Sequence, residues 1–235
     1  MNEQTVTLFE IHQELDGPAG VITWPAAHAP QAGQYLLAYA PDQNEPLPTV
    51  LFPGWDPARS LHDKMLRLAP PLPAAWNAGQ PLLVRGPFGT GFRMPGGAQR
   101  IALAAWDCSP ARLMPLLLQG LGQGAAVALY SRHPAESLPT AVELLPREGL
   151  LDALQWADFL AVDLAYTQLP ALRAALGLTR GQPCPCPAQA LVRIAMPCGG
   201  AAECGVCAVR TQDGWKQACQ DGPVFPLDLL VEESA

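Results

Sequence analysis

The stretch MPCGGAAECGVCAVRTQDGWKQACQDGPVF, residues 196–225, holds four of the seven cysteines of this chain. These form a C-x5-C-x2-C-x11-C array that consists of Cys198, Cys204, Cys207 and Cys219. Glycines between them let the backbone fold closely around a bound group. Thiolate sulfurs are soft ligands that select iron–sulfur clusters and zinc. The array therefore predicts a metal centre with these four cysteines as its ligands.

Two kinds of metal centre fit this array. A plant-type [2Fe–2S] site has three cysteines on one loop and a fourth further on, and its first gap is one residue shorter than the gap between Cys198 and Cys204. Four thiolates also bind structural zinc, but a zinc ribbon usually has two C-x2-C knuckles, and only Cys204 and Cys207 form one here. We favour the [2Fe–2S] cluster and keep two alternatives: structural zinc, and cysteines that are unliganded or disulfide-bonded.

The other three cysteines give weaker signals. Cys184 and Cys186 form a C-x-C pair between prolines in GQPCPCP, for which a surface loop is the first interpretation. Cys108 is a lone cysteine at an expected strand-to-helix turn, where packing is a commoner role than chemistry. Because the total is odd and four cysteines share one array, we expect thiols in a reducing compartment rather than a disulfide scaffold.

Composition argues against several classes of protein. The chain has 235 residues, and its 14 Lys and Arg against 21 Asp and Glu give a net charge of −7, which disfavours a nucleic acid or an anionic membrane as partner. No apolar run reaches the roughly 18 residues of a membrane-spanning helix, so membrane insertion is not expected. The start, MNEQTVTLFEIHQ, lacks the pattern of a secretory signal, and we expect a cytoplasmic protein.

Hydrophobic periodicity divides the chain into three parts. Residues 1–95 contain short runs such as AGVITWP and PTVLFP between Pro, Gly, Asn and Asp clusters, which predicts a small antiparallel β-barrel or sandwich. In residues 96–190, apolar strands alternate with helical segments such as LPALRAALGL, which predicts a parallel sheet in a doubly wound α/β domain. Residues 191–235 form the third part, which contains the cysteine loop.

Three segments of the chain resemble the electron-transfer subunit of dihydroorotate dehydrogenase, a member of the ferredoxin–NADP reductase-like superfamily. They are MPCGGAAECGVCAV and ACQDGPVF near the C-terminus, and AGQPLLVRGPFGTGF at residues 78–92. The resemblance implies a flavin-type barrel that binds FAD and an α/β domain that binds NAD. It further implies a [2Fe–2S] cluster, held by the four cysteines, that relays electrons between that FAD and an FMN in a separate catalytic subunit. Pyrimidine biosynthesis is the pathway that it implies.

The barrel strand that holds the FAD pyrophosphate in this family departs from the family pattern. Family members have an Arg-x-Tyr/Pro-Ser type motif, whereas residues 46–53 read PLPTVLFP, with no cation and only Thr49 to offer a hydroxyl. A pyrophosphate needs cationic or N–H partners to replace its hydration. The other candidate FAD contacts are Gly86, Gly89 and Gly91 in GPFGTGF, for which a structural turn is an equal interpretation. FAD binding is therefore left open.

The strand-to-helix turn at the start of the α/β domain also departs from the family. A dinucleotide pyrophosphate rests there on a Gly-rich turn, but residues 104–112 read AAWDCSPAR. Trp106 fills space that a nucleotide needs, and Asp107 places a negative charge beside its phosphates. Asp107 or Ser109 makes a good N-cap, and Pro110 suits the first helical position. NAD binding is therefore not expected.

The segment PARSLHDK, residues 57–64, offers a further candidate for an anion site. Arg59 and Ser60 could form a displaced pair that binds the FAD phosphates, although a solvated loop is the commoner case. His62 has no evident partner in the sequence, and a surface histidine is the default. We assign no catalytic acid, base or nucleophile, because the implied chemistry is outer-sphere electron transfer.

These observations predict an oxidoreductase component. We expect an iron–sulfur protein that relays single electrons between a partner flavoenzyme, such as a dihydroorotate dehydrogenase-like catalytic subunit, and another carrier. One alternative is a degenerate paralogue without nucleotide cofactors, which serves as a cluster-bearing adaptor or structural subunit of a redox complex. Another is a structural zinc protein with four thiolate ligands. The sequence leaves open whether the chain is itself an enzyme.

Overall fold

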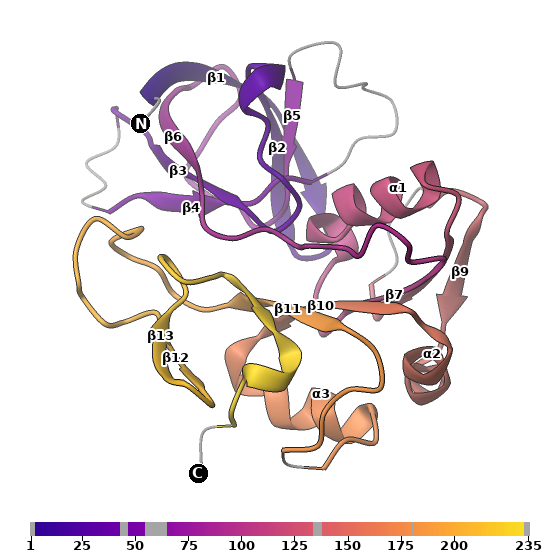
Figure 1. Cartoon of the computed structure of the whole chain (residues 1–235). Coiled ribbons are helices and arrows are strands. Elements are labelled where there is room, and N and C mark those ends of the chain that lie inside the picture. The colour runs from indigo at the N-terminus through magenta and orange to yellow at the C-terminus, as the bar shows by residue number, and fades with distance from the viewer. Residues whose placement is uncertain (1–2, 43–46, 55–64, 134–137, 180, 233–235) are drawn as a thin grey trace.

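The structure is a computed structural model that describes residues 3–42, 47–54, 65–133, 138–179 and 181–232. Within these residues the strands form two six-stranded sheets and one two-stranded sheet. In Figure 1 the N-terminal sheet lies above the second sheet, and the C-terminal hairpin lies beside both. The predicted fold class is confirmed: an antiparallel domain is followed by an α/β domain and a small cysteine-rich segment.

The N-terminal sheet is antiparallel, with the strand order β4-β3-β6-β1-β2-β5. Its strands are β1 (Glu3–Glu14), β2 (Gly17–Thr23), β3 (Tyr35–Tyr39), β4 (Thr49–Leu51), β5 (Met65–Leu68) and β6 (Pro81–Phe88). An isolated bridge between Pro53 and Leu68 joins the end of β4 to β5, so the two edge strands meet. Alternate side chains, such as Val6 and Leu8 on β1, are buried inside. The sheet thus closes into a barrel.

The second sheet has the order β14-β11-β10-β7-β8-β9, and its pairs are parallel except for β11 with β14. Its first five strands are β7 (Arg100–Ala105), β8 (Ala126–Ser131), β9 (Val142–Leu145), β10 (Phe159–Ala165) and β11 (Ala188–Arg193). Three helices connect them, α1 (Met114–Gly122), α2 (Leu150–Trp156) and α3 (Leu169–Ala175). Figure 1 shows α1 on the barrel side of the sheet and α2 and α3 on the other side.

Both faces of this sheet are buried, as the apolar strand sequences require. On β7, Ile101 and Leu103 pack with α1 in one core, whereas Ala102 and Ala104 belong to the core that holds α2 and α3. The sequence did not indicate β9, because this short edge strand has two exposed residues, Glu143 and Leu144, and so lacks an apolar run. The sequence did not indicate β5 (Met65–Leu68) either, because a strand of four residues carries too short an apolar pattern.

The C-terminal segment packs onto the α/β domain rather than standing alone. Strands β12 (Ala208–Thr211) and β13 (Gly214–Gln217) form the hairpin, and β14 (Val224–Pro226) then joins the edge of the second sheet. The buried side chains of Val209 and Phe225 share one core with α3. The cysteine loop is therefore held on a folded support.

No helix in the described part of the chain is both long and apolar enough to cross a lipid bilayer.

Candidate metal centre and adjoining cavity

The four cysteines of the array form two close pairs. The Sγ atoms of Cys198 and Cys204 are 3.4 Å apart, and those of Cys207 and Cys219 are 3.2 Å apart. Two sulfurs bound to one tetrahedral metal at about 2.3 Å lie roughly 3.8 Å apart, which is close to both spacings. Within the described residues, no group of three or more His, Cys, Asp or Glu side chains converges on one point. The array thus places its four thiol sulfurs in two pairs on one segment.

The loop that carries Cys198 and Cys204 owes its shape to glycine. Gly199 has a φ of 54°, in the left-handed region, and its N–H donates to the carbonyl of Met196 at 3.0 Å. A Cβ at Gly199 would lie 2.5 Å from Leu37 Cδ1 of β3, so only glycine lets the loop approach the barrel this closely. The cysteine loop therefore packs closely against β3.

The two pairs lie in different surroundings. Cys204 is exposed, whereas Cys207 and Cys219 are buried. Backbone hydrogen bonds at Ala202 and Gly200 lower the pKa of Cys198 to about 7, which favours its thiolate. Burial, followed by the hydrogen bond with Cys207, raises the pKa of Cys219 to about 12. One pair faces the surface, and the other faces the protein interior.

The barrel contacts the cysteine segment through Tyr35 of β3 and the GPFGTGF turn. The Tyr35 hydroxyl donates to the carbonyl of Cys219 at 2.9 Å, and burial followed by the nearby cysteines raises the pKa of Tyr35 above its usual range. Thr90 N–H donates to the carbonyl of Gly222 at 2.6 Å, and its hydroxyl donates to the carbonyl of Val224 at 3.0 Å. The turn therefore holds the cysteine segment in place.

Gly89 of that turn has a structural task. Its φ is 74°, and a Cβ there would lie 2.6 Å from the carbonyl oxygen of Gly222. Gly86 lies on β6, and Gly91 lines a smaller cavity of about 360 Å³ together with Thr90 and Arg93. Gly89 thus lies between the barrel and the C-terminal segment, whereas Gly86 packs against Tyr35 and Leu36 within the barrel.

A larger cavity of about 550 Å³ lies between the barrel and the carboxyl edge of the parallel sheet. Its described lining consists of Pro48, Val50, Phe52, Ala69, Pro70, Pro71, Arg112, Ala165, Arg193, Ile194, Ala195, Met196 and Pro197. Val50 of β4 and the two residues that flank the strand, Pro48 and Phe52, alternate along the chain and line the cavity, whereas Thr49 is not in this lining. FAD contacts at Thr49, Gly86, Gly89 and Gly91 stay predictions.

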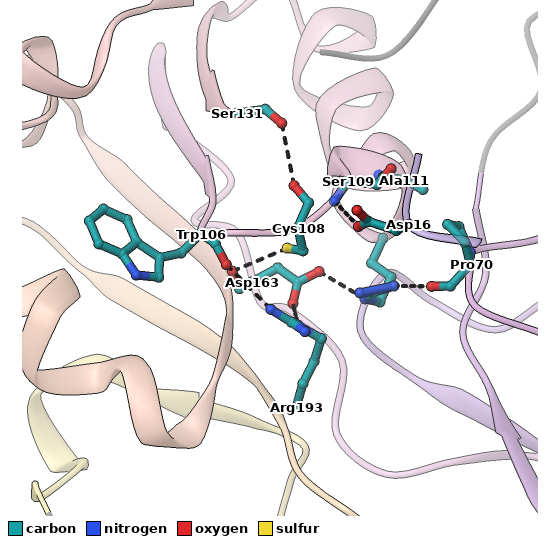
Figure 2. Close-up of polar contacts among 10 residues, drawn as sticks. Asp16, Pro70, Trp106, Cys108, Ser109, Ala111, Ser131, Asp163 and Arg193 are labelled. Carbon is teal, nitrogen blue, oxygen red and sulfur yellow. Dashed lines mark hydrogen bonds and ion pairs between the residues drawn. The ribbon is translucent and has the colours of Figure 1, made fainter. Parts of the chain in front are cut away.

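Two arginines in the lining of the larger cavity, Arg112 and Arg193, share the carboxylate of Asp163, whose contact with Arg193 is drawn in Figure 2. Asp163 of β10 is fully buried, and its two carboxylate oxygens accept hydrogen bonds from Nε of Arg112 and Nε of Arg193, each at 2.8 Å. Arg112 also donates to the carbonyl of Pro70, which lies in the barrel region just after β5. A buried carboxylate needs charged partners, and the two arginines supply them. The hydrogen bond from Arg112 to Pro70 also joins the α/β domain to the barrel.

The strand-to-helix turn after β7 is filled by protein. Trp106 is buried, its ring centroid lies 5.8 Å from that of Tyr130, and the Arg147 guanidinium lies 4.8 Å above it. Asp107 has a φ of 49°, a left-handed conformation that glycine more often supplies. Its carboxylate accepts a hydrogen bond from Gln168 at 3.0 Å. The turn keeps its bend, and the Asp107 carboxylate is used in contacts within the protein, but the buried Nε1 of Trp106 has no hydrogen-bond partner among the described residues.

The start of the following helical turn matches its prediction. Ser109 is the N-cap of a 3-10 helix that begins at Pro110, and its hydroxyl accepts the N–H of Ala111 at 3.2 Å. The Ser109 N–H donates to the Asp16 carboxylate, which lies between β1 and β2 of the barrel (Figure 2). This turn, like Arg112, is bonded to the barrel.

The other candidate residues lie away from the cysteine array. Cys108 is buried, and burial raises its pKa above the usual range. Cys184 is half-buried, and its N–H donates to Asp228 at 2.8 Å. Cys186 is also half-buried. The candidate anion pair of Arg59 and Ser60, and His62 with it, lie outside the described residues.

Comparison with known proteins identifies the cysteine segment. Residues 195–231 match the protein family described as the iron–sulfur cluster binding domain of dihydroorotate dehydrogenase B. The resemblance to the electron-transfer subunit of dihydroorotate dehydrogenase is confirmed. All four cysteines of the array lie within the matched residues 195–231. No curated protein sequence matches the chain.

Solved structures share the fold over most of the chain. The structure of an NADH-dependent reduced ferredoxin-NADP oxidoreductase superposes with a TM-score of 0.74 at 15% identity, over 96% of this chain and 89% of that chain. Ferredoxin-NADP+ reductase from Plasmodium falciparum gives 0.51 at 7% identity, over 75% and 90%. An Amycolatopsis cytochrome P450 reductase gives 0.51 at 16% identity, over 75% and 66%. Identities this low establish a shared fold of the ferredoxin reductase type.

Proposed function

We propose that this chain is a [2Fe–2S] electron-transfer protein that relays single electrons between a partner flavoenzyme and another carrier. The observation that carries the proposal is the division of the four cysteines into two pairs of sulfurs, 3.4 Å and 3.2 Å apart, inside an iron–sulfur binding domain. A [2Fe–2S] cluster uses two thiolates on each of its two irons. The pairs supply these ligands, and a bound cluster would take up and release one electron.

The surroundings of the cysteines suit this role. Cys204 and the neighbouring Val206 are exposed, so this side of the loop is open to a partner. Cys207 and Cys219 are buried against the protein, where water is excluded. Hydrogen bonds to the sulfurs and access to solvent both raise the reduction potential of a cluster, and backbone N–H groups near Cys198 are placed to donate them.

The partner that we propose is a flavin-containing catalytic subunit of the dihydroorotate dehydrogenase type. The family of the cysteine segment supports this choice. Pro197, which lines the larger cavity, directly precedes the ligand Cys198, so a cofactor held there would lie beside the cluster loop. FAD retained in that cavity would connect the cluster to a second carrier. Pyrimidine synthesis is the pathway that follows from the family.

A second candidate function is a cluster-bearing adaptor without nucleotide cofactors. The turn filled by Trp106 favours it, because Arg147 and Tyr130 already pack against that ring. In this version the chain holds a cluster and contacts other proteins of a redox complex. Both versions share the metal centre and differ in whether flavin is bound.

The test is an anaerobic visible spectrum of the purified protein, with iron, sulfide, zinc and flavin analyses of the same sample. We expect absorption bands of an oxidised [2Fe–2S] cluster, with two irons and two sulfides per chain. Extracted FAD would favour the relay, and a cluster without flavin would favour the adaptor. A colourless protein with one zinc would contradict both, since zinc has no visible bands.

A further inference from the structure

Tyr35 of β3 joins the barrel to the peptide of Cys219 through a buried contact. Its side chain has no exposed surface, and its hydroxyl donates to the Cys219 carbonyl oxygen at 2.9 Å, across 184 residues of sequence. Among the described residues, no other donor contacts that carbonyl. Because a buried carbonyl without a partner costs free energy, this hydrogen bond helps to keep the turn that carries Cys219 in place.

The ring of Tyr35 is held in position by its neighbours. Its centroid lies 5.8 Å from that of Phe88 and 6.2 Å from that of Phe52. A Cβ at Gly89 would lie 2.9 Å from Cε1 of the ring, so the absence of a side chain there makes room for it. A ring packed this closely carries its hydroxyl to a fixed position. The donor is therefore in place before any group binds to the cysteines.

The carbonyl that accepts this hydrogen bond lies on the same side as the Cys219 sulfur. A Cβ at Gly200 would lie 3.6 Å from the Cys219 carbonyl oxygen and 4.0 Å from its Sγ. That Sγ lies in turn 3.2 Å from the Sγ of Cys207. Tyr35, Cys207 and Cys219 belong to one buried core, where water screens a dipole only weakly. The hydroxyl thus directs its positive end at a peptide that carries one sulfur of the buried pair.

We propose that Tyr35 is a positioning residue of the metal centre, whose hydroxyl fixes the Cys219 ligand and raises the reduction potential of the bound cluster. The inference rests on the proposed function and deepens it by naming a barrel residue that tunes the cluster. An electron that enters the centre adds one negative charge, which the positive end of a buried O–H dipole stabilises. Groups behind the ligands of a metal orient those ligands and tune its potential.

The test is an anaerobic redox titration of Tyr35→Phe, which removes the hydroxyl and keeps the ring. We expect the full iron and sulfide content. At a fixed applied potential, the ratio of reduced to oxidised cluster should fall about threefold to tenfold, the equivalent of one hydrogen bond. A tenfold change corresponds to about 59 mV for a one-electron couple. Visible absorbance measures the ratio in the wild type and the variant.

Tyr166→Phe is the matched control. The Tyr166 hydroxyl accepts the N–H of Arg210 at 2.9 Å and donates to the carbonyl of Val231 at 2.9 Å, so its loss also removes hydrogen bonds to the C-terminal segment. Neither partner is a cysteine of the array. Urea unfolding should show lower stability for both variants, but the ratio of reduced to oxidised cluster in Tyr166→Phe should stay within about twofold of the wild type.

Two results of the titration would overturn the assignment. One is an unchanged ratio in Tyr35→Phe protein that holds a full cluster. The other is an equal fall in both variants, since that would report a general loosening of the C-terminal segment. A wild type without a cluster would instead reject the proposed function, which the visible spectrum of the untitrated protein shows separately.

A measurement on the wild type covers the case in which Tyr35→Phe holds no cluster. The chain has four tyrosines, whose NMR signals are followed with isotope-labelled rings and assigned in metal-free Tyr→Phe variants. A reduced [2Fe–2S] cluster is paramagnetic and broadens the signals of nearby nuclei. We expect reduction to broaden Tyr35 most and to leave Tyr130, which packs on Trp106, sharp. Equally sharp signals from both would overturn the assignment.

Discussion

The cysteine loop and the strand-to-helix turn after β7 are the two regions where the sequence analysis looked for a cofactor, and they differ in what fills them. The loop keeps four thiols as two sulfur pairs, and its glycines let it pack on the barrel. In the turn, Trp106 fills the space, and the Asp107 carboxylate bonds Gln168 and pairs with Arg132. The loop thus leaves its sulfur atoms available to a ligand, whereas the turn is filled by an aromatic side chain, although the buried Nε1 of Trp106 has no hydrogen-bond partner among the described residues.

The largest expected effect is loss of the metal centre. Cys207→Ser should abolish the cluster, because a serine hydroxyl does not replace a buried thiolate, and unfolding should be local to the C-terminal segment. Visible absorbance and iron content measure the result. Cys186→Ser is the matched control and should keep the full cluster, since Cys186 lies outside the array. A stoichiometric, unchanged cluster in Cys207→Ser would remove Cys207 from the ligand set.

The filled turn is tested by Trp106→Ala. Loss of a buried aromatic side chain should lower the free energy of unfolding by about 3–5 kcal/mol, measured by urea unfolding. Trp215→Ala should cost far less, because Trp215 is 63% exposed. We expect that neither the wild type nor the variant binds NADH, which is measured by NADH fluorescence. Tight NADH binding by the wild type would show that the turn accepts a nucleotide, and would end the contrast between the two regions.

The support of the cysteine loop is tested by Gly89→Ala. The positive φ and the carbonyl of Gly222 at 2.6 Å from the added Cβ should lower stability by about 1–3 kcal/mol and loosen the C-terminal segment. Hydrogen exchange of β14 measures the loosening. Gly96→Ala is the control, because a Cβ there meets no atom within 4 Å. Equal protection of β14 in both variants would mean that the turn does not hold the cysteine segment.

The smallest effect lies at the amino edge of the parallel sheet, away from both regions. The hydrogen bond from Arg100, followed by backbone bonds at Gln99 and Arg100, lowers the pKa of Asp158. Since the folded pKa lies below the unfolded one, its stabilisation is present above about pH 4 and is lost as the pH falls through the folded pKa. Asp158→Asn should therefore lower the melting temperature slightly at pH 7 and not at pH 2. An equal difference at both pH values would contradict the assignment.

The sequence predicted much of the fold because its signals are local. Alternation of apolar strands with helical segments indicated the α/β domain, and short strands between turn residues indicated the barrel. Strand β9 was missed, because an exposed edge strand such as Val142–Leu145 carries little apolar pattern. Closure of the barrel through Pro53 and Leu68 also had no local signal, since it depends on two strands that are not neighbours in the chain.

By itself the sequence predicted the ligands of the metal centre, because thiols at a fixed spacing carry their chemistry in a single segment. Only the tertiary structure decided how those thiols pair, what lies beside them and what Gly89 supports. Arg112, Asp163 and Arg193 are separated by 51 and 30 residues, and no spacing rule links them. They meet because parallel strands bring their carboxyl ends to one edge of the sheet, where the barrel closes over them.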